Sequence, residues 1–176
     1  MTTDSDGPAG GFPTPPREFT DEEGREIGVR SADAAETETD PLCQMYLDFD
    51  PADRAQGIPP VEEESIRDWL DLILTQDSFN VVAWHGDRAV GHATLVPDET
   101  GAYELAIFVL DSYQGAYVGT ELVRSLLGLA RAEDIAYVWL TVERWNDPAI
   151  RLYRSVGFET TDSQSFEMEM TISLAG

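Results

Sequence analysis

The chain has 176 residues, of which 34 are Asp or Glu, 11 are Arg and none is Lys, so its formal net charge is −23. This length suits one domain, while the single cysteine, Cys43, excludes an intrachain disulfide and, with only two histidines, argues against a metal site. The charge argues against a nucleic-acid partner, because phosphate is repelled, and no apolar run approaches the roughly 20 residues of a membrane-spanning helix.

Residues 1–24 contain eight Gly or Pro and no Leu, Ile, Val or Trp. Such a segment buries too little apolar surface to offset the entropy that is lost when it is ordered. The composition therefore predicts a flexible, acidic N-terminal arm over residues 1–24 and one folded domain over residues 25–176.

Apolar periodicity, turn residues and helix-start signals divide the rest of the chain into elements. In chain order they predict a short strand at 27–29, a helix at 40–49, a loop at 50–59, a helix that begins near residue 60, strands at 79–84, 89–96 and 103–110, a helix at 117–132, a strand at 135–142, a helix at 146–156 and a strand at 166–172. The strands at 103–110 and 135–142, with the helix between them, form one βαβ unit. Those two strands should lie parallel in an otherwise antiparallel sheet.

Acidity of this degree can indicate disorder, but 42% of the residues are hydrophobic and most of the chain shows apolar periodicity. We interpret the acidic excess as a surface adapted to high salt, as in a halophile, because at about 1 M salt the screening length is only about 3 Å. A merely acidic mesophilic protein is the alternative. Without a signal peptide pattern, we expect a soluble, cytoplasmic protein with no membrane partner.

A glycine-bearing turn, residues 114–120, leads into the helix predicted at 117–132. Such a turn directs free backbone N–H groups and the positive end of the helix at one spot, which is typical of a pyrophosphate site. It is neither a Walker loop nor a GxGxxG dinucleotide turn. Residues 114–154 hold five acids and five arginines, whereas the rest of the chain carries the whole net charge of −23. An anion therefore meets its least repulsive surface here, unless these arginines only pair with neighbouring acids.

At this turn the chain resembles the GNAT superfamily of acetyl-CoA-dependent N-acetyltransferases. The family signature, Gln/Arg-x-x-Gly-x-Gly/Ala, corresponds to Gln114, Tyr117 and Gly119. A second family segment, N-x-x-A-x-x-L-Y-x-x-x-G-F, matches residues 146–158. The departure is Tyr117, which stands where the family usually has glycine and whose ring either crowds the turn or covers the cofactor.

The resemblance implies a mixed α/β fold of GNAT type, with a mostly antiparallel sheet of six to seven strands, one parallel pair and four flanking helices. It implies transfer of an acetyl group from acetyl-CoA, as co-substrate, to a primary amine of a small molecule or peptide, by direct attack in a ternary complex. The chain would be a monomer or a homodimer. A non-catalytic acyl-CoA-binding module for regulation or interaction, on the same fold, is the alternative. The implied cofactor-binding residues are Phe108, Val109, Leu110, Gln114, Gly115, Ala116, Tyr117, Val118, Gly119, Thr120, Asn146 and Tyr153.

The resemblance also implies that Tyr153 protonates the departing thiolate, since an unperturbed phenol titrates near pH 10. The alternative is an ordinary packed tyrosine. Asn146 lies at the predicted start of its helix, where it either caps the helix or contacts the cofactor.

The residue that removes the proton from the amine is less well marked. Glu104 is the only carboxylate in the strand at 103–110, so it is a candidate catalytic base, although a solvated glutamate at a strand end is the plainer interpretation. His92, on the neighbouring strand, is a second candidate because histidine titrates near neutral pH. The acidic residues Asp48, Asp50 and Asp53 either attract a cationic amine or are simply solvated surface.

Overall fold

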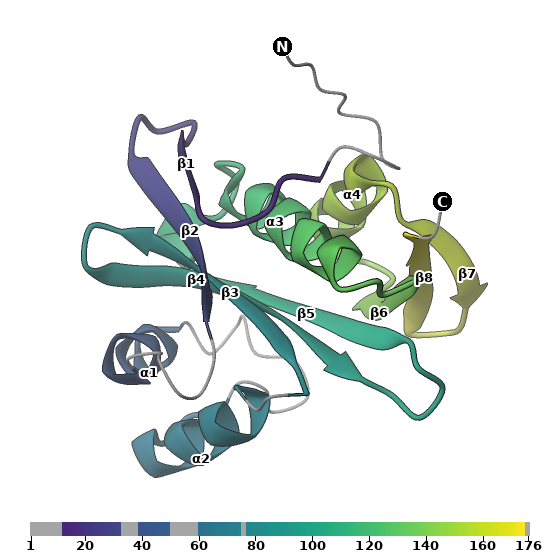
Figure 1. The fold of residues 1–176 in the computed structure, drawn as a ribbon, viewed down its shortest axis with the longest axis horizontal. Helices are drawn as coiled ribbons and strands as arrows, with labels where there is room; N and C mark the ends of the chain where they lie inside the picture. Colours follow the sequence, from purple (N-terminus) through teal and green to yellow (C-terminus); the bar gives the residue numbers. More distant parts are fainter. Residues whose placement is uncertain (1–11, 33–38, 50–59, 75–76, 175–176) are drawn as a thin grey trace.

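The computed structural model describes residues 12–32, 39–49, 60–74 and 77–174, and Figure 1 shows how its elements are arranged. A short 3-10 turn (Asp111–Tyr113) precedes the third helix. The helices and strands, in chain order, are β1 (Arg17–Thr20), β2 (Glu26–Ala32), α1 (Thr39–Leu47), α2 (Glu63–Ile73), β3 (Phe79–His85), β4 (Arg88–Pro97), β5 (Tyr103–Val109), α3 (Val118–Ala132), β6 (Tyr137–Glu143), α4 (Asp147–Val156), β7 (Glu159–Ser163) and β8 (Glu167–Ser173).

The strands of the described chain form one sheet of eight strands in the order β1-β2-β3-β4-β5-β6-β8-β7. Neighbouring strands are antiparallel except for β5 and β6, which run parallel. The predicted mixed fold with one parallel pair is confirmed. The sheet has eight strands, more than the predicted six or seven, because the sequence pattern does not indicate β1 and β7. β1 has only four residues, too few for a clear alternation, and β7 has no buried residue.

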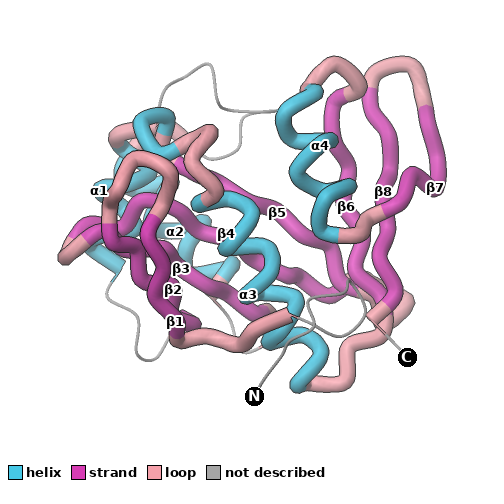
Figure 2. The backbone as a smooth tube through the Cα atoms, turned by 90° about the horizontal axis from the view of Figure 1, so that it is seen from above, coloured by secondary structure: helices cyan, strands magenta, loops and turns pink. Residues whose placement is uncertain are grey.

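Helices cover both faces of the sheet (Figures 1 and 2). On one face, the ring of Phe108 in β5 contacts Tyr46 of α1 and Trp69 of α2, at centroid distances of 5.6 and 5.5 Å. On the other face, α3 packs against Ile107 and Val109. Successive side chains of a strand point to opposite faces. The molecule therefore has α1 and α2 on one side of β5 and α3 on the other.

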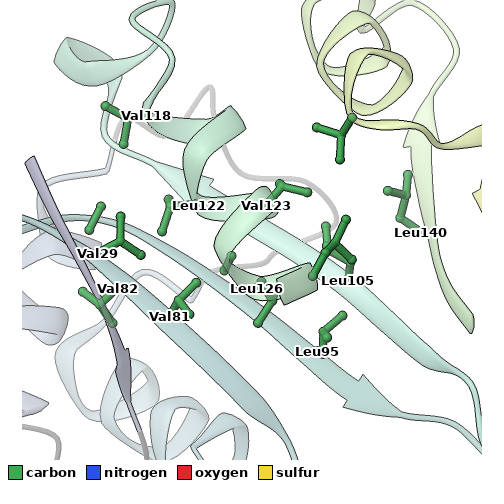
Figure 3. Close-up of a cluster of buried hydrophobic side chains, with 14 of the residues drawn as sticks. Val29, Val81, Val82, Leu95, Leu105, Val118, Leu122, Val123, Leu126 and Leu140 are labelled. Carbon is green, nitrogen blue, oxygen red and sulfur yellow. The ribbon is translucent and has the colours of Figure 1, made fainter. Parts of the chain in front are cut away.

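The core between α3 and the sheet depends on an apolar stripe of the helix. Val118, Leu122 and Leu126 are fully buried and recur at helical spacing. Figure 3 shows them gathered with side chains of the strands, among them Leu95 and Leu105. Each fully buried Leu or Val contributes about 1.5–3 kcal/mol. This packing fixes the helix whose first turn carries the predicted pyrophosphate site.

The predicted N-terminal arm is wrong over residues 12–24, which belong to the folded domain. Phe12 packs against the core, β1 pairs with β2, and the Arg17 guanidinium binds the carboxylate of Glu121 in α3. The cause is tertiary: an edge strand of four residues is held by its neighbour and by one ion pair, which composition does not reveal. Residues 1–11 and the predicted loop at 50–59, with Asp50 and Asp53, lie outside the described residues.

The crossing of this N-terminal segment over α3 yields a stability prediction. A methyl group at Gly128 would overlap the carbonyl oxygen of Pro13. Gly128→Ala should therefore destabilise the full chain by about 1–3 kcal/mol. In a chain that lacks residues 2–14 the same substitution should stabilise by about 0.5–1 kcal/mol, because Ala favours a helix over Gly. Urea unfolding of the four proteins measures both effects, and the same sign in the two backgrounds would contradict the contact.

Candidate functional site

The two parallel strands of the sheet touch only briefly. β5 pairs with β6 at Tyr103–Val138 and Glu104–Trp139, whereas it pairs with β4 along its whole length. β6 instead pairs with β8 over seven positions. Beyond Glu104 the strands diverge, and Figure 2 shows β6 turning away from β5 beneath α4. The divergence leaves backbone edges of both strands facing a gap in the sheet.

A cleft of about 670 Å³ occupies this gap. Its lining includes Ile107 and Val109 from one face of the sheet and Phe108 and Phe49 from the other, so it extends through the sheet. Nine of the predicted cofactor-binding residues line it: Phe108, Val109, Gln114, Gly115, Tyr117, Gly119, Thr120, Asn146 and Tyr153.

The other three predicted cofactor-binding residues are buried beside the cleft and do not line it. Leu110, Ala116 and Val118 are 3%, 1% and 0% exposed. The backbone N–H of Leu110 donates to the carbonyl of Val90, and the carbonyl of Ala116 accepts from Glu22. Because their side chains are buried, only their backbone atoms are left to contact a ligand in the cleft.

Eight lining residues that the sequence did not indicate come from β5, β6 and α4 and from the segment just after α1. They are Phe49, Ile107, Glu143, Pro148, Ala149, Arg151, Leu152 and Ser155. Those of α4 lie inside the quoted segment at 146–158, whose periodicity could have indicated them. Phe49 and Glu143 have no such signal, because their place depends on where α1 and β6 end relative to β5.

The turn before α3 exposes backbone donors. The N-cap residue Tyr117 is in the left-handed region with φ 76°, and Gly115 has φ 75°. The first intrahelical bond runs from the N–H of Glu121 to the carbonyl of Tyr117. The preceding N–H groups, at residues 118–120, therefore have no acceptor within the helix and lie at its positive end. This arrangement is suited to an anion.

Tyr117 and Gly119 fill their positions for different reasons. A left-handed conformation costs a residue other than glycine about 1–2 kcal/mol. The Tyr117 ring is 61% exposed and lines the cleft, so it does not pack into the turn. A methyl group on Gly119 would lie 3.1 Å from Leu152 and 3.5 Å from Ile107. Gly119 therefore allows α3, α4 and β5 to approach closely.

The turn between β1 and β2, residues 21–25, packs against residues 113–116, at the start of the turn that leads into α3. The Arg25 guanidinium lies 4.0 Å over the Tyr113 ring and bonds the Asp21 carboxylate at 2.8 Å. The Tyr113 hydroxyl is 2.6 Å from Nδ1 of His85. Burial opposes ionisation of Asp21, but hydrogen bonds from Arg25 and from the backbone of Glu23 hold its pKa below the ordinary value.

The charged residues of the lining balance each other. They are Glu143 and Arg151. Within the described chain the Arg151 guanidinium makes no ion pair or hydrogen bond, while the carboxylate of Glu121, in the first turn of α3, is bound by both Arg17 and Arg124. The lining of the cleft therefore has no net charge, as the balance of charges over residues 114–154 predicts. The Arg151 guanidinium is available to bind an anion.

Tyr153 lies in α4 and Asn146 is the N-cap residue of that helix, and both line the cleft. The ring of Tyr153 is buried and contacts Phe158 at 5.8 Å, and burial raises the pKa of its phenol well above 10. Its hydroxyl makes no hydrogen bond within the described chain. The Asn146 side chain accepts from the N–H of Ala149 at 3.3 Å, so the predicted helix cap is confirmed.

Glu104 does not line the cleft. It lies at the vertex of the cleft, the point where β5 and β6 begin to diverge, and there it pairs with Trp139. It is about 13 Å along the strand from Phe108, on the same face. Burial raises its pKa, and the charges of Asp98 and Glu167 raise it further. Asp98 stays ionised, because hydrogen bonds from Thr100 and the indole of Trp139 lower its own pKa.

His92 is a structural residue rather than a base at the cleft. It is fully buried, its Nδ1 is 2.6 Å from the Tyr46 hydroxyl, and its Nε2 is 2.8 Å from Oδ1 of Asn80. Since Oδ1 only accepts, Nε2 carries the proton and Nδ1 accepts from Tyr46. Burial lowers the pKa of His92 to about 3.

The remaining candidates lie away from the cleft. Asp48 lies 3.6 Å from Arg88 in an exposed ion pair, and Cys43 is buried in α1, where burial raises its pKa. No group of three or more potential metal ligands occurs among the residues that the structure describes. No helix in the described ranges is long and apolar enough to cross a membrane.

Comparison with known proteins gives one consistent result. Residues 40–158 match the acetyltransferase (GNAT) family. An uncharacterized N-acetyltransferase of Mycobacterium tuberculosis is 27% identical over 121 residues, which are 62% of this chain and 78% of that one. The N-alpha-acetyltransferase RimI of the same organism is 45% identical over 58 residues, 32% of this chain and 35% of RimI. The structure of yncA from Salmonella typhimurium, solved with its cofactor acetyl-CoA, superposes with a TM-score of 0.65 at 19% identity and covers 85% of this chain and 94% of that one.

The buried histidine yields a prediction on stability and pH. An unfolded histidine takes up a proton near pH 6.5, whereas His92 in the folded chain does so near pH 3. Between these values the unfolded state binds more protons, so His92 lowers the free energy of unfolding as pH falls, by up to about 1.4 kcal/mol per pH unit. His92→Gln keeps a donor and an acceptor but does not titrate. Urea unfolding at pH 7, 6, 5 and 4 should show a shallower loss for the variant than for wild type, and parallel curves would contradict the assignment.

Proposed function

Because the chain belongs to the acetyltransferase (GNAT) family, we propose that it transfers an acetyl group from acetyl-CoA to a primary amine by direct attack in a ternary complex. The observation that supports this most is the cleft between β5 and β6, whose lining comes from both faces of the sheet. The two substrates can then meet from opposite sides without a covalent enzyme intermediate.

The residues of the α3 and α4 face suit coenzyme A. The N–H groups at 118–120 and the Arg151 guanidinium offer donors and positive charge to a diphosphate, while the lining as a whole is neutral in a strongly acidic chain. The backbone edge of β5 near Phe108 and Val109 offers hydrogen bonds to an amide-bearing arm, and Asn146 lines the same side. When bound, acetyl-CoA supplies the acetyl thioester.

Two residues would move the protons. Tyr153 keeps its proton at working pH, because burial raises its pKa, and donates it to the departing thiolate. Glu104 accepts the proton of the incoming ammonium through a chain of water molecules, because it lies outside the lining, about 13 Å along β5 from Phe108. Its raised pKa brings it closer to neutrality, which suits a base.

The acceptor is open within the class of primary amines. The likeness to RimI, whose name describes an N-alpha-acetyltransferase, makes the α-amino group of a peptide the first acceptor to test. Small amines follow. We further propose a cytoplasmic protein that acts as a monomer or homodimer without a metal.

The decisive experiment is calorimetric titration with coenzyme A, followed by a panel of peptides and small amines assayed for free thiol release in multi-molar KCl. We expect coenzyme A to bind and at least one amine to be acetylated. Absence of coenzyme A binding would overturn the proposal. Binding without turnover of any amine would replace it with a non-catalytic acyl-CoA-binding module.

Tyr153→Phe should lower kcat by about 10²–10⁴-fold while KM for acetyl-CoA changes little, because the ring remains and only the proton donor is lost. Steady-state assays of thiol release measure this. Tyr103→Phe, which removes a hydroxyl from β5 outside the lining, serves as the matched control. Equal activity of the two variants would show that Tyr153 is only packed.

Glu104→Gln should lower kcat/KM for the amine by about 10²-fold or more and flatten the acidic limb of its pH profile. In wild type this limb should lie above the ordinary range for glutamate, because burial and the charges of Asp98 and Glu167 raise the pKa of Glu104. Glu99→Gln, in the exposed turn before β5, is the control. A variant at residue 104 with an unchanged profile would exclude it as the base.

We also propose that the acidic surface is an adaptation to high salt. Glu143 and Glu167 are direct neighbours across β6 and β8, a like-charge pair that is less costly when screened. Lowering the salt from multi-molar KCl to about 0.1 M lengthens the screening distance to about 10 Å and should lower the melting temperature. A melting temperature indifferent to salt would contradict this interpretation.

A further inference from the structure

The two sides of the cleft differ in chemistry, and the difference bears on the acceptor of the proposed function. On the α1 side the lining is aromatic. The rings of Phe49 and Phe108 lie 6.2 Å apart. Tyr46 contacts both rings at 5.6 Å, and Trp69 meets Phe108 edge to face at 5.5 Å. Among the described residues, the side chains of this wall that line the cleft, Phe49 and Phe108, offer no polar group to a hydroxylated substrate.

Glu143 is the carboxylate of the lining and belongs to the same side. Paired residues of neighbouring strands share a face, so Trp139 lies on the face of Glu104 and Phe108. Glu143, four residues after Trp139, shares that face by strand alternation. Glu167, in β8, is the residue paired with Glu143, and neither carboxylate has an ion pair within the described chain. A single ammonium placed here would relieve their repulsion.

An exposed aromatic pair borders the opening. Trp145 and Phe166 are 61% and 71% exposed, and their rings meet edge to face at 6.4 Å. Along the chain, Trp145 lies between two lining residues, Glu143 and Asn146. Backbone bonds of 3.0 Å, from Arg144 to Phe166 and from residue 146 to 143, hold the loop in place. Two large rings held in water beside a cleft offer an apolar surface and an electron-rich face to a ligand.

We propose that the acceptor is a primary ammonium carried on an apolar or aromatic body, with the ammonium at Glu143 and the apolar body against the Trp145–Phe166 pair. This assignment rests on the proposed function. A peptide that begins with a large apolar residue and a free arylalkylamine share this chemistry. Polyamines and aminoglycosides do not, because they have no apolar body to cover the aromatic pair.

The test is binding, measured separately from turnover. Phenethylamine and tripeptides that begin with Phe or Leu are titrated calorimetrically into the protein with coenzyme A, beside spermidine and tripeptides that begin with Ser. We expect the apolar amines to bind at least tenfold more tightly than the polar ones. A peptide-only or amine-only response identifies the source, and either supports the proposal. Equal or tighter binding of the polar amines overturns it.

Variants then locate the site. Trp145→Ala and Phe166→Ala should each abolish most of the tenfold preference, Trp145→Phe should restore part of it, and Glu143→Gln should weaken all amines. Tyr137→Ala, which removes an exposed ring from the far end of β6, is the matched control. Unchanged coenzyme A binding shows that each variant is folded. A preference that survives Trp145→Ala, or a dimer in sedimentation that this variant dissociates, overturns the proposal. Preferential binding without acetyl transfer would sink the proposed function alone and leave this assignment standing.

Discussion

The divergence of β5 and β6 is the constraint on which the site depends. β6 forms its hydrogen bonds mainly with β8, and β5 forms its own mainly with β4. Only two residue pairs, between β5 and β6, therefore join the two halves of the sheet. Backbone groups that face the gap need partners from water or a ligand, since unpaired buried amides are costly. A sheet split in this way presents hydrogen-bonding edges to an extended molecule.

Long periodic elements and two short motifs could be predicted from the sequence, whereas features made by tertiary contact could not. The helix at 118–132 and its parallel strands follow from an apolar stripe and a βαβ spacing. β1 has no such pattern, because Arg17 and the edge of β2 hold it in place. Glu143 enters the cleft only because β6 ends where β5 has turned away. The sequence predicts His92 as a possible base, but in the fold Tyr46 and Asn80 occupy both of its ring nitrogens.

Electrostatics explains why the N-terminal strand matters to a site that it does not touch. Glu121 stands in the first turn of α3, where a carboxylate is favoured by the helix dipole but competes with any anionic ligand. Arg17 and Arg124 hold it from two sides. In a chain with 11 arginines and 34 acids, placing two of the arginines on this one carboxylate keeps the positive end of α3 available.

The two faces of the cleft are built by independent means, and this separates what is common from what is particular. The α3 and α4 face is made of the turn and the segment that carry the family resemblance, so it reports the shared co-substrate. The opposite face rests on the chain of hydrogen bonds from Tyr46 through His92 to Asn80, which fixes α1 against β4 and so positions the Phe49–Phe108 wall. A wall held by a buried, fully bonded network is rigid, and rigid aromatic rings select by shape and polarity. In the proposed function, the acceptor is therefore selected on the α1 side, by residues that the family motifs do not include.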